Sequence, residues 1–133
     1  MARPKFSKLE VQILEALWAH GKASIREIQE SFSGPRPAYT TIQTTVYRLE
    51  GKNAVRRVRK ISNADIFEPI VSREVTRHRL LEEALSLFGG QVLPMMAQLV
   101  EADKLTHKDV RELEHLIEDR DKRRKASERG GAT

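Results

Sequence analysis

Residues Pro35–Lys60 read PRPAYTTIQTTVYRLEGKNAVRRVRK, and their pattern predicts a helix followed by a basic segment. Ile42, Val46 and Leu49 are spaced i, i+4 and i+7, which places them on one narrow face that packs on a core. The opposite face carries hydroxyl, amide and guanidinium groups, on Thr40, Thr41, Gln43, Thr44, Tyr47 and Arg48. Threonine is β-branched and a poor helix former, so this composition runs against intrinsic helix propensity. Such departures from local propensity are often found at functional surfaces.

The polar face of this helix is suited to DNA. A solvated surface helix normally carries Glu and Lys, whereas these side chains can contact base edges and phosphates without bringing negative charge near the nucleic acid. We therefore predict a DNA-recognition helix whose polar face reads the bases. The neighbouring cations are predicted to contact phosphates and form the wing: Arg36, Lys52, Arg56, Arg57, Arg59 and Lys60.

The positive charge of the chain is concentrated in its first half. Of the net charge of +5, all arises in residues 1–70, which hold 12 Lys and Arg against 7 Asp and Glu. Residues 71–133 hold 12 of each kind. An excess localised around the predicted reading helix is typical of a protein that binds a polyanion. A basic surface kept for solubility is the alternative.

The segment before the reading helix completes a known DNA-binding motif. Ser7–Glu10 and Ser24–Glu27 each have the spacing of a capping box, which marks the start of a helix. Trp18, in the first of these helices, is interpreted as a core residue, and Ala23 as a brief strand position. Because Ser33–Pro35 breaks the second helix, a short helix, a turn and the threonine-rich helix form a predicted helix-turn-helix.

A β-hairpin is predicted after the reading helix. Val55–Ile61 is basic and β-branched, a turn follows at Ser62–Asp65, and Ile66–Phe67 starts the return strand. The apolar residues of the first segment are spaced by three, so it could instead extend the preceding helix. With Pro69 closing the unit, residues 1–70 form a predicted winged-helix DNA-binding domain.

Residues 71–125 are predicted to form a helical dimerisation domain. Helices are expected from Ser72 to Phe88, from Gln91 to Ala102, and after a capping-box-like start at Thr106. Residues 126–133 are predicted to be a disordered tail. The fold class is therefore mainly α with a small β-wing: an N-terminal winged helix-turn-helix plus a C-terminal three-helix dimerisation domain.

The second domain carries more apolar surface than it can bury alone. Three helices with a single aromatic residue make too small a core, so a second copy in a two-fold dimer is the expected cover. An alternative is that this half folds back on the first domain as one monomeric unit. The predicted dimerisation residues are Leu81, Leu85, Phe88, Met95, Met96, Leu99, Leu113, Leu116 and Ile117.

The composition argues against several other classes. The chain has no cysteine, which excludes disulfides and thiolate metal sites and suits a cytoplasmic protein, and no apolar run is long enough to span a bilayer. His107 and His115 could face one metal, but a solvated or capping role is favoured. We predict no catalytic residue, metal or cofactor. The main competing function is a winged helix that docks onto proteins instead of DNA.

The order and spacing of several motifs resemble one known family. Tyr39–Thr44 with Arg48–Leu49, then Val55–Arg57, Pro69–Arg73 and Phe88–Gly90, are similar to the BlaI/MecI/CopY type of penicillinase repressor over residues 7 to 120. The resemblance implies a repressor that binds a palindromic operator as a homodimer and controls a β-lactam-response or related gene set. It also implies DNA contacts in the third helix at Thr40, Thr41, Gln43, Thr44 and Arg48, and in the wing at Arg56 and Arg57.

This chain departs from the family pattern in three places. Ser62–Asn63 stands where Gly-Arg is common at the wing tip, and Asp65 where an aromatic is common, so wing contacts could fall to Arg59 and Lys60. Staphylococcal-type members are cut by a membrane sensor protease at an Asn-Phe bond, and the aligned pair here is Gln98–Leu99. The copper-responsive members use a C-terminal cysteine cluster, which this cysteine-free chain lacks.

Overall fold

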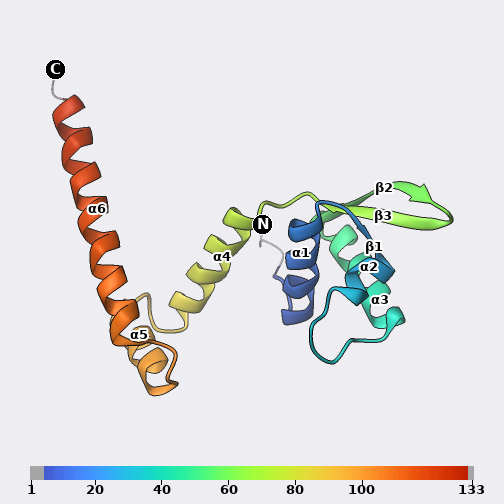
Figure 1. The fold of residues 1–133 in the computed structure, drawn as a ribbon, viewed down its shortest axis with the longest axis horizontal. Coiled ribbons are helices and arrows are strands. Elements are labelled where there is room, and N and C mark those ends of the chain that lie inside the picture. The colour runs from blue at the N-terminus through green and yellow to red at the C-terminus, as the bar shows by residue number, and fades with distance from the viewer. Residues whose placement is uncertain (1–4, 132–133) are drawn as a thin grey trace. The chain divides into compact units, whose positions relative to one another are not determined.

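The computed structural model describes residues 5–131, in which six helices and three strands confirm the mainly helical fold with a small sheet (Figure 1). The chain divides into two compact units, Met1–Leu80 and Leu81–Thr133. The elements in chain order are α1 (Lys8–His20), β1 (Ala23–Ser24), α2 (Ile25–Glu30), α3 (Tyr39–Gly51), β2 (Val55–Ile61), β3 (Ala64–Pro69), α4 (Arg73–Ser86), α5 (Val92–Glu101) and α6 (His107–Gly131).

The predicted capping boxes are present at the starts of α1 and α2. The Ser7 hydroxyl accepts a hydrogen bond from the Glu10 amide while the Glu10 carboxylate accepts one from the Ser7 amide, and Ser24 and Glu27 repeat the arrangement. These reciprocal bonds satisfy amides that a helix start otherwise leaves unpaired. They also lower the pKa of Glu27, through hydrogen bonds from the Ser24 backbone and hydroxyl.

α2 and α3 form the predicted helix-turn-helix, and the core of the first unit lies beneath them. The apolar stripe of α3 is fully buried, with Ile42, Val46 and Leu49 at 0% exposure. The other largest buried side chains come from all the neighbouring elements: Ile13, Leu14 and Leu17 of α1, Ile28 of α2, Val55 of β2 and Phe67 of β3. Thr45 is buried beside this stripe, and most of the remaining α3 surface is left to solvent.

The wing is a hairpin in a three-stranded antiparallel sheet with the order β1-β3-β2. This result confirms the strand prediction and excludes the alternative of an extended helix. Ser62 and Asn63 form the turn, both with positive φ (49° and 67°), as a two-residue type I′ hairpin requires. Arg57 pairs with Phe67 and Arg59 with Ile66, so the register shifts by one residue at Val58, which is a β-bulge.

The first half of α4 belongs to the first unit, which therefore extends beyond residue 70. Trp18 Nε1 donates a hydrogen bond of 3.0 Å to the Val71 carbonyl, which confirms Trp18 as a residue packed against the core. Arg77 donates to both oxygens of Glu15 in α1, at 3.1 and 3.2 Å. These contacts fix the start of α4 on α1, and the compact units divide between Leu80 and Leu81.

The second unit consists of the end of α4 together with α5 and α6. The capping-box-like start of α6 is formed as predicted, since the Thr106 amide donates to Asp109 Oδ2 and the Asp109 amide donates to Thr106 Oγ1. Hydrogen bonds from Thr106 lower the pKa of Asp109. In the structure α6 continues to Gly131, into the segment from residue 126 for which a disordered tail was predicted. Residues 132–133 lie outside the described part of the chain.

Candidate DNA interface

The exposed face of α3 presents two rows of polar side chains. Thr40, Thr44 and Arg48 form one row at i, i+4 and i+8, and all three are exposed. Thr44 Oγ1 donates to the Thr40 carbonyl at 2.9 Å, and Thr45 Oγ1 donates to the Thr41 carbonyl at 2.7 Å. These back-bonds use the hydroxyl hydrogens and leave the hydroxyl oxygens available as acceptors.

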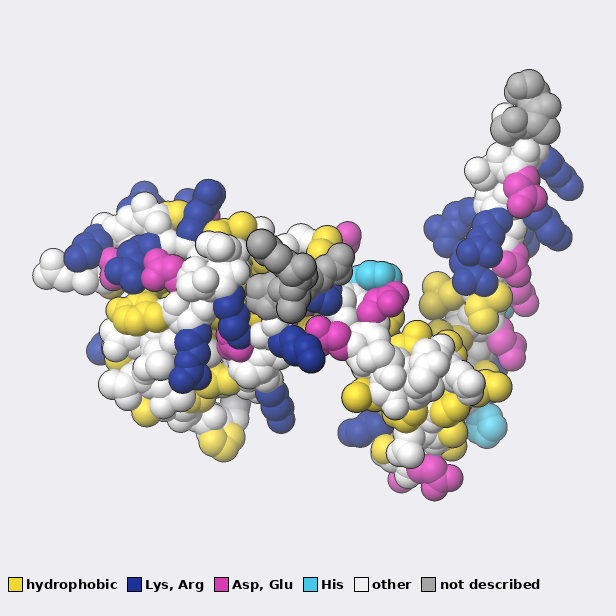
Figure 2. Space-filling model, turned by 180° about the vertical axis from the view of Figure 1, so that it is seen from behind, with side chains coloured by type: hydrophobic (Ala, Val, Ile, Leu, Met, Phe, Trp, Pro, Cys, Tyr) yellow, Lys and Arg dark blue, Asp and Glu magenta, His cyan; other side chains and the backbone are white. Residues whose placement is uncertain are grey.

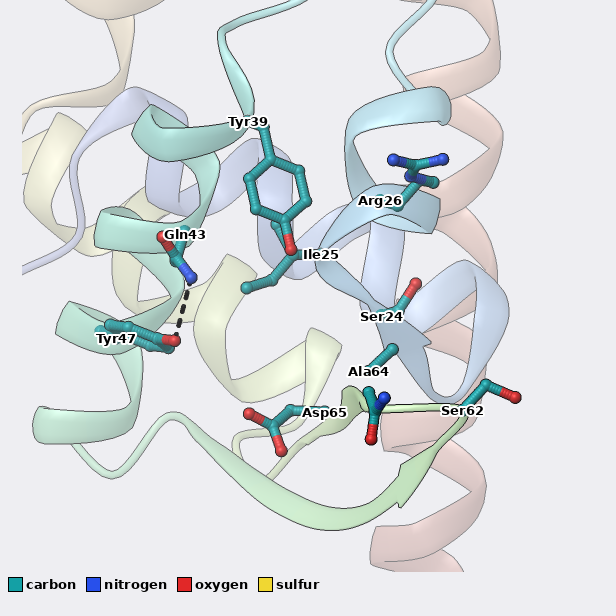
Figure 3. Close-up of a pocket in the computed structure, with 10 residues that line it drawn as sticks. Ser24, Ile25, Arg26, Tyr39, Gln43, Tyr47, Ser62, Ala64 and Asp65 are labelled. Atoms are coloured by element: carbon teal, nitrogen blue, oxygen red, sulfur yellow. Dashed lines mark hydrogen bonds between the residues drawn. The ribbon is translucent and has the colours of Figure 1, made fainter.

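The second row faces a hollow between α3 and the wing (Figure 3). Tyr39 and Tyr47 are 43% and 41% exposed, and Gln43 lies between them and donates from Nε2 to the Tyr47 hydroxyl at 3.1 Å. Tyr39 was not among the predicted contacts, although its spacing to Gln43 places it in the same row. The hollow has a volume of about 380 Å³ and is lined by Ser24, Ile25, Arg26, Tyr39, Gln43, Tyr47, Ser62, Asn63, Ala64 and Asp65.

Four of the predicted DNA-contacting cations are unpaired. Within residues 5–131, the side chains of Arg36, Arg48, Arg59 and Lys60 are exposed and form no ion pair or hydrogen bond. Arg36 lies in the turn before α3, Arg48 in the last turns of α3, and the other two on the wing strand β2. Their positive charge is therefore available to an external anion such as a phosphate.

Lys52 has a different position from the one expected of a phosphate contact. Its Nζ lies 2.8 Å from both carboxylate oxygens of Glu10, 2.7 Å from the Lys5 carbonyl oxygen, and 5.6 Å from the centre of the Phe6 ring. Burial alone would raise the pKa of Glu10, but Lys52 and the hydrogen bonds from Ser7 outweigh it and hold that pKa below 4.5. Lys52 is thus a structural partner of a buried carboxylate.

Arg56 and Arg57, the wing cations that the family resemblance implies, are paired with carboxylates of the chain. Arg56 forms an ion pair with Glu68 across the hairpin. Arg57 forms ion pairs with Glu50 of α3 at 3.2 Å and with Asp65 of β3 at 3.1 Å. The sequence did not reveal these pairs, because the partners lie in different elements.

The predicted dimerisation residues lie in the second unit, where they are half-buried or exposed. Leu85, Phe88, Met95, Met96 and Leu99 are half-buried. The exposed members are Leu81 (55%), Leu113 (42%), Leu116 (61%) and Ile117 (50%). Figure 2 shows hydrophobic side chains gathered over α5 and the adjoining part of α6. Leu87 and Leu93, at 84% and 81%, are more exposed than any predicted member and were not among the predicted residues.

Gln98 and Leu99, the aligned cleavage pair, lie within α5, so both backbone positions are helical. In the described part of the chain, no cluster of His, Cys, Asp and Glu is arranged to hold a metal ion. No helix among the residues described is both long and apolar enough to cross a membrane.

Comparison with known proteins shows the family of this chain. The sequence pattern of the penicillinase repressor family matches residues 6–119. The penicillinase repressor of Bacillus licheniformis is 24% identical over 127 residues, which cover 92% of this chain and 96% of that relative.

Two solved structures are similar to the chain at low sequence identity, and the first of them shares its fold. A MarR variant from E. coli has a TM-score of 0.54 at 13% identity, covering 86% of this chain and 77% of its own. The DNA-binding domain of the repressor BlaI has a TM-score of 0.47 at 23% identity, covering 54% of this chain and 88% of its own. Since the family pattern matches most of the chain, the protein belongs to the penicillinase repressor family of DNA-binding repressors.

Proposed function

We propose that this protein is a sequence-specific repressor that binds a palindromic operator as a homodimer. The observation that carries the proposal is the charge of the exposed α3 face. Glu50 is the only acidic residue of α3, and Arg57 neutralises it at 3.2 Å. The remaining exposed groups are hydroxyls, an amide and a guanidinium, which can approach DNA without repulsion.

The two kinds of contact fall on different residues. Thr40, Thr41, Gln43, Thr44 and Arg48 read base edges from α3. Arg36, Arg59 and Lys60 contact phosphates, which fixes the register of α3 on the duplex without selecting a sequence. Their exposure and lack of partners in the described chain support this assignment.

The second unit joins two copies. None of the side chains between residues 81 and 130 is buried in the single chain, although the unit is rich in Leu, Met and Val. A second copy would remove this apolar surface from water, and apolar burial is the main force in association. Two linked reading heads would engage half-sites about 34 Å apart, and dimerisation would make the second contact intramolecular.

Release of the operator follows from loss of the dimer. A cut between Gln98 and Leu99 by a sensor protease would separate α6 from the rest of the unit and remove its share of the apolar surface. Each head would then bind its half-site alone, and occupancy would fall by orders of magnitude. Because both residues are helical, α5 must unwind locally before a protease can cut there.

The proposal can be tested by selecting tight-binding duplexes from a random pool and measuring affinity by fluorescence anisotropy over a salt series. With Arg36, Arg59 and Lys60 each contacting one phosphate in both subunits, log K should fall against log salt with a slope of about −5. Duplexes from β-lactam-response promoters are the first natural sequences to compare. A protein that binds no duplex even at low salt would refute the proposal and favour a protein-docking module.

Variants separate the two kinds of contact. Gln43→Ala and Thr44→Ala should relax the sequence preference, whereas Arg59→Ala should weaken selected and random duplexes by similar factors. The opposite pattern, with preference altered by Arg59→Ala alone, would contradict the division of roles.

A further inference from the structure

The guanidinium of Arg57 lies at the centre of a cluster that joins the wing to α3. Its Cζ is 5.3 Å from the centre of the Tyr47 ring and 5.2 Å from that of Phe67. Its Nη2 lies 3.2 Å from Glu50 Oε1, and its Nη1 lies 3.1 Å from Asp65 Oδ2. We name these five residues the Arg57 clasp.

The Arg57 clasp connects three elements. Arg57 is on β2, Tyr47 and Glu50 are on α3, and Asp65 and Phe67 are on β3. Phe67 has 0% exposure and belongs to the core, so one wall of the cluster is fixed. A planar guanidinium suits such a place, because it can stack on rings and donate to two carboxylates at once.

The two acidic residues of the Arg57 clasp depend on Arg57 to compensate their negative charge. Asp65 Oδ1 is buried without a hydrogen-bond partner in the described chain, so the ion pair through Oδ2 is what compensates the burial of this carboxylate. Burial would lower the pKa of Arg57, but the charges of Glu50 and Asp65 outweigh it and raise that pKa. Two carboxylates beside a DNA-binding face would otherwise repel phosphates.

We propose that Arg57 is a positioning residue, which sets the angle of the wing against α3 and so places Arg59 and Lys60 on the DNA. The inference rests on the proposed DNA-binding function. The bulge at Val58 follows Arg57 directly, so the direction of the wing tip is determined at this point of β2. Arg57 therefore contributes to DNA affinity by orienting the wing and not by contacting a phosphate itself.

Two mutations distinguish a positioning role of Arg57 from a purely electrostatic one, because the two roles predict changes in DNA affinity of opposite sign. Glu50→Gln and Asp65→Asn each remove a negative charge near the DNA, so electrostatics alone predicts tighter binding. The Arg57 clasp predicts the reverse, a loss of about three- to tenfold on a selected duplex, because the wing loses its anchor. Glu68→Gln is the matched control: it removes the same charge from the Arg56 pair outside the clasp, and it should bind as tightly as the wild type or more tightly.

A double-mutant cycle gives the second test. Arg57→Lys keeps the positive charge but cannot stack and pair in the same way, so it should lose about as much affinity as Glu50→Gln. Arg59→Ala should then reduce DNA affinity far less in the Arg57→Lys background than in the wild type, because Arg59 is already displaced from its phosphate in that background. Independent phosphate contacts would give additive losses, and full affinity of Arg57→Lys would mean that only the charge matters.

The measurements use the full chain, with fluorescence anisotropy on one selected duplex and thermal unfolding of each variant. Thermal midpoints close to that of the wild type show that the affinities refer to folded protein. If the wild type binds no duplex, the proposed function and the Arg57 clasp both fail. If the wild type binds but Glu50→Gln and Asp65→Asn bind equally or more tightly, the clasp alone is overturned.

Discussion

Replacing Lys52 by methionine should destabilise the first unit by about 2–3 kcal/mol. The Glu10 side chain is 5% exposed and that of Lys52 is 31% exposed. Removing one partner of a fully buried ion pair costs about 3–5 kcal/mol, and an exposed pair contributes about 0–1 kcal/mol, so a pair with one buried member lies between these limits. Because methionine keeps the apolar stem of the lysine side chain, the loss of stability measures the contribution of the ammonium group.

The assay is thermal unfolding followed by far-ultraviolet circular dichroism. For a unit of this size, 1 kcal/mol shifts the midpoint by about 4–8 °C, so Lys52→Met should lower it by about 8–24 °C at pH 7. Lys60→Met is the matched control, because Lys60 is exposed and unpaired within the described residues, and its effect should stay within about 0.5 kcal/mol.

The difference between the two proteins should depend on pH. Since folding lowers the pKa of Glu10, the stabilisation from its charged form is fully present above the unfolded value, near 4.5, and is lost as the pH falls through the folded value. Lys52→Met removes the partner, so protonating Glu10 relieves an unpaired buried charge. The gap in midpoint should therefore narrow below pH 4.5. A gap under 2 °C at pH 7, or an equal gap at pH 3, would refute this account.

Three further predictions concern other parts of the chain. Trp18→Phe should cost about 1–2 kcal/mol in urea unfolding, because the Val71 carbonyl loses its donor at 3.0 Å. Arg59→Ala should make the salt slope of DNA binding shallower by about 0.9 per subunit, and an unchanged slope would exclude a phosphate contact. If the protein is the proposed dimer, Leu116→Glu should convert it to a monomer in sedimentation at micromolar concentration, because the change places a charge in the apolar surface. A variant that still sediments as a dimer would move the interface elsewhere.

The local features of the fold could be predicted from sequence because each depends on residues close together in the chain. Ile42, Val46 and Leu49 mark the buried face of α3 by their spacing alone, and the capping boxes fix the starts of α1 and α2 within four residues. The hairpin was ambiguous for a physical reason. The bulge at Val58 interrupts the two-residue alternation of a strand, which made the apolar residues of β2 look helical.

The long-range charge pairs could not be predicted. Glu10 and Lys52 are separated by 42 positions, and no spacing rule links two side chains from different elements at such a distance. Lys52 and Arg57 therefore looked like free cations in a basic segment. A count of positive charge therefore overestimates the number of side chains that are free to bind phosphate, because it includes cations such as these, which are paired within the chain.

Because of the bulge at Val58, the number of residues in β2 matters more for the geometry of the wing than the identity of those residues. Residues that pair across the hairpin lie on the same side of it, so Arg57 shares a side with Phe67, and Arg59 shares the other side with Ile66. Deleting Val58 would leave Arg59 opposite Ile66 and every residue up to the turn on its present side, but it would remove the bend that the bulge introduces into β2. Loss of this one residue should therefore change the direction of the wing tip while its cations keep their sides of the hairpin, an effect that no change of charge in β2 would produce.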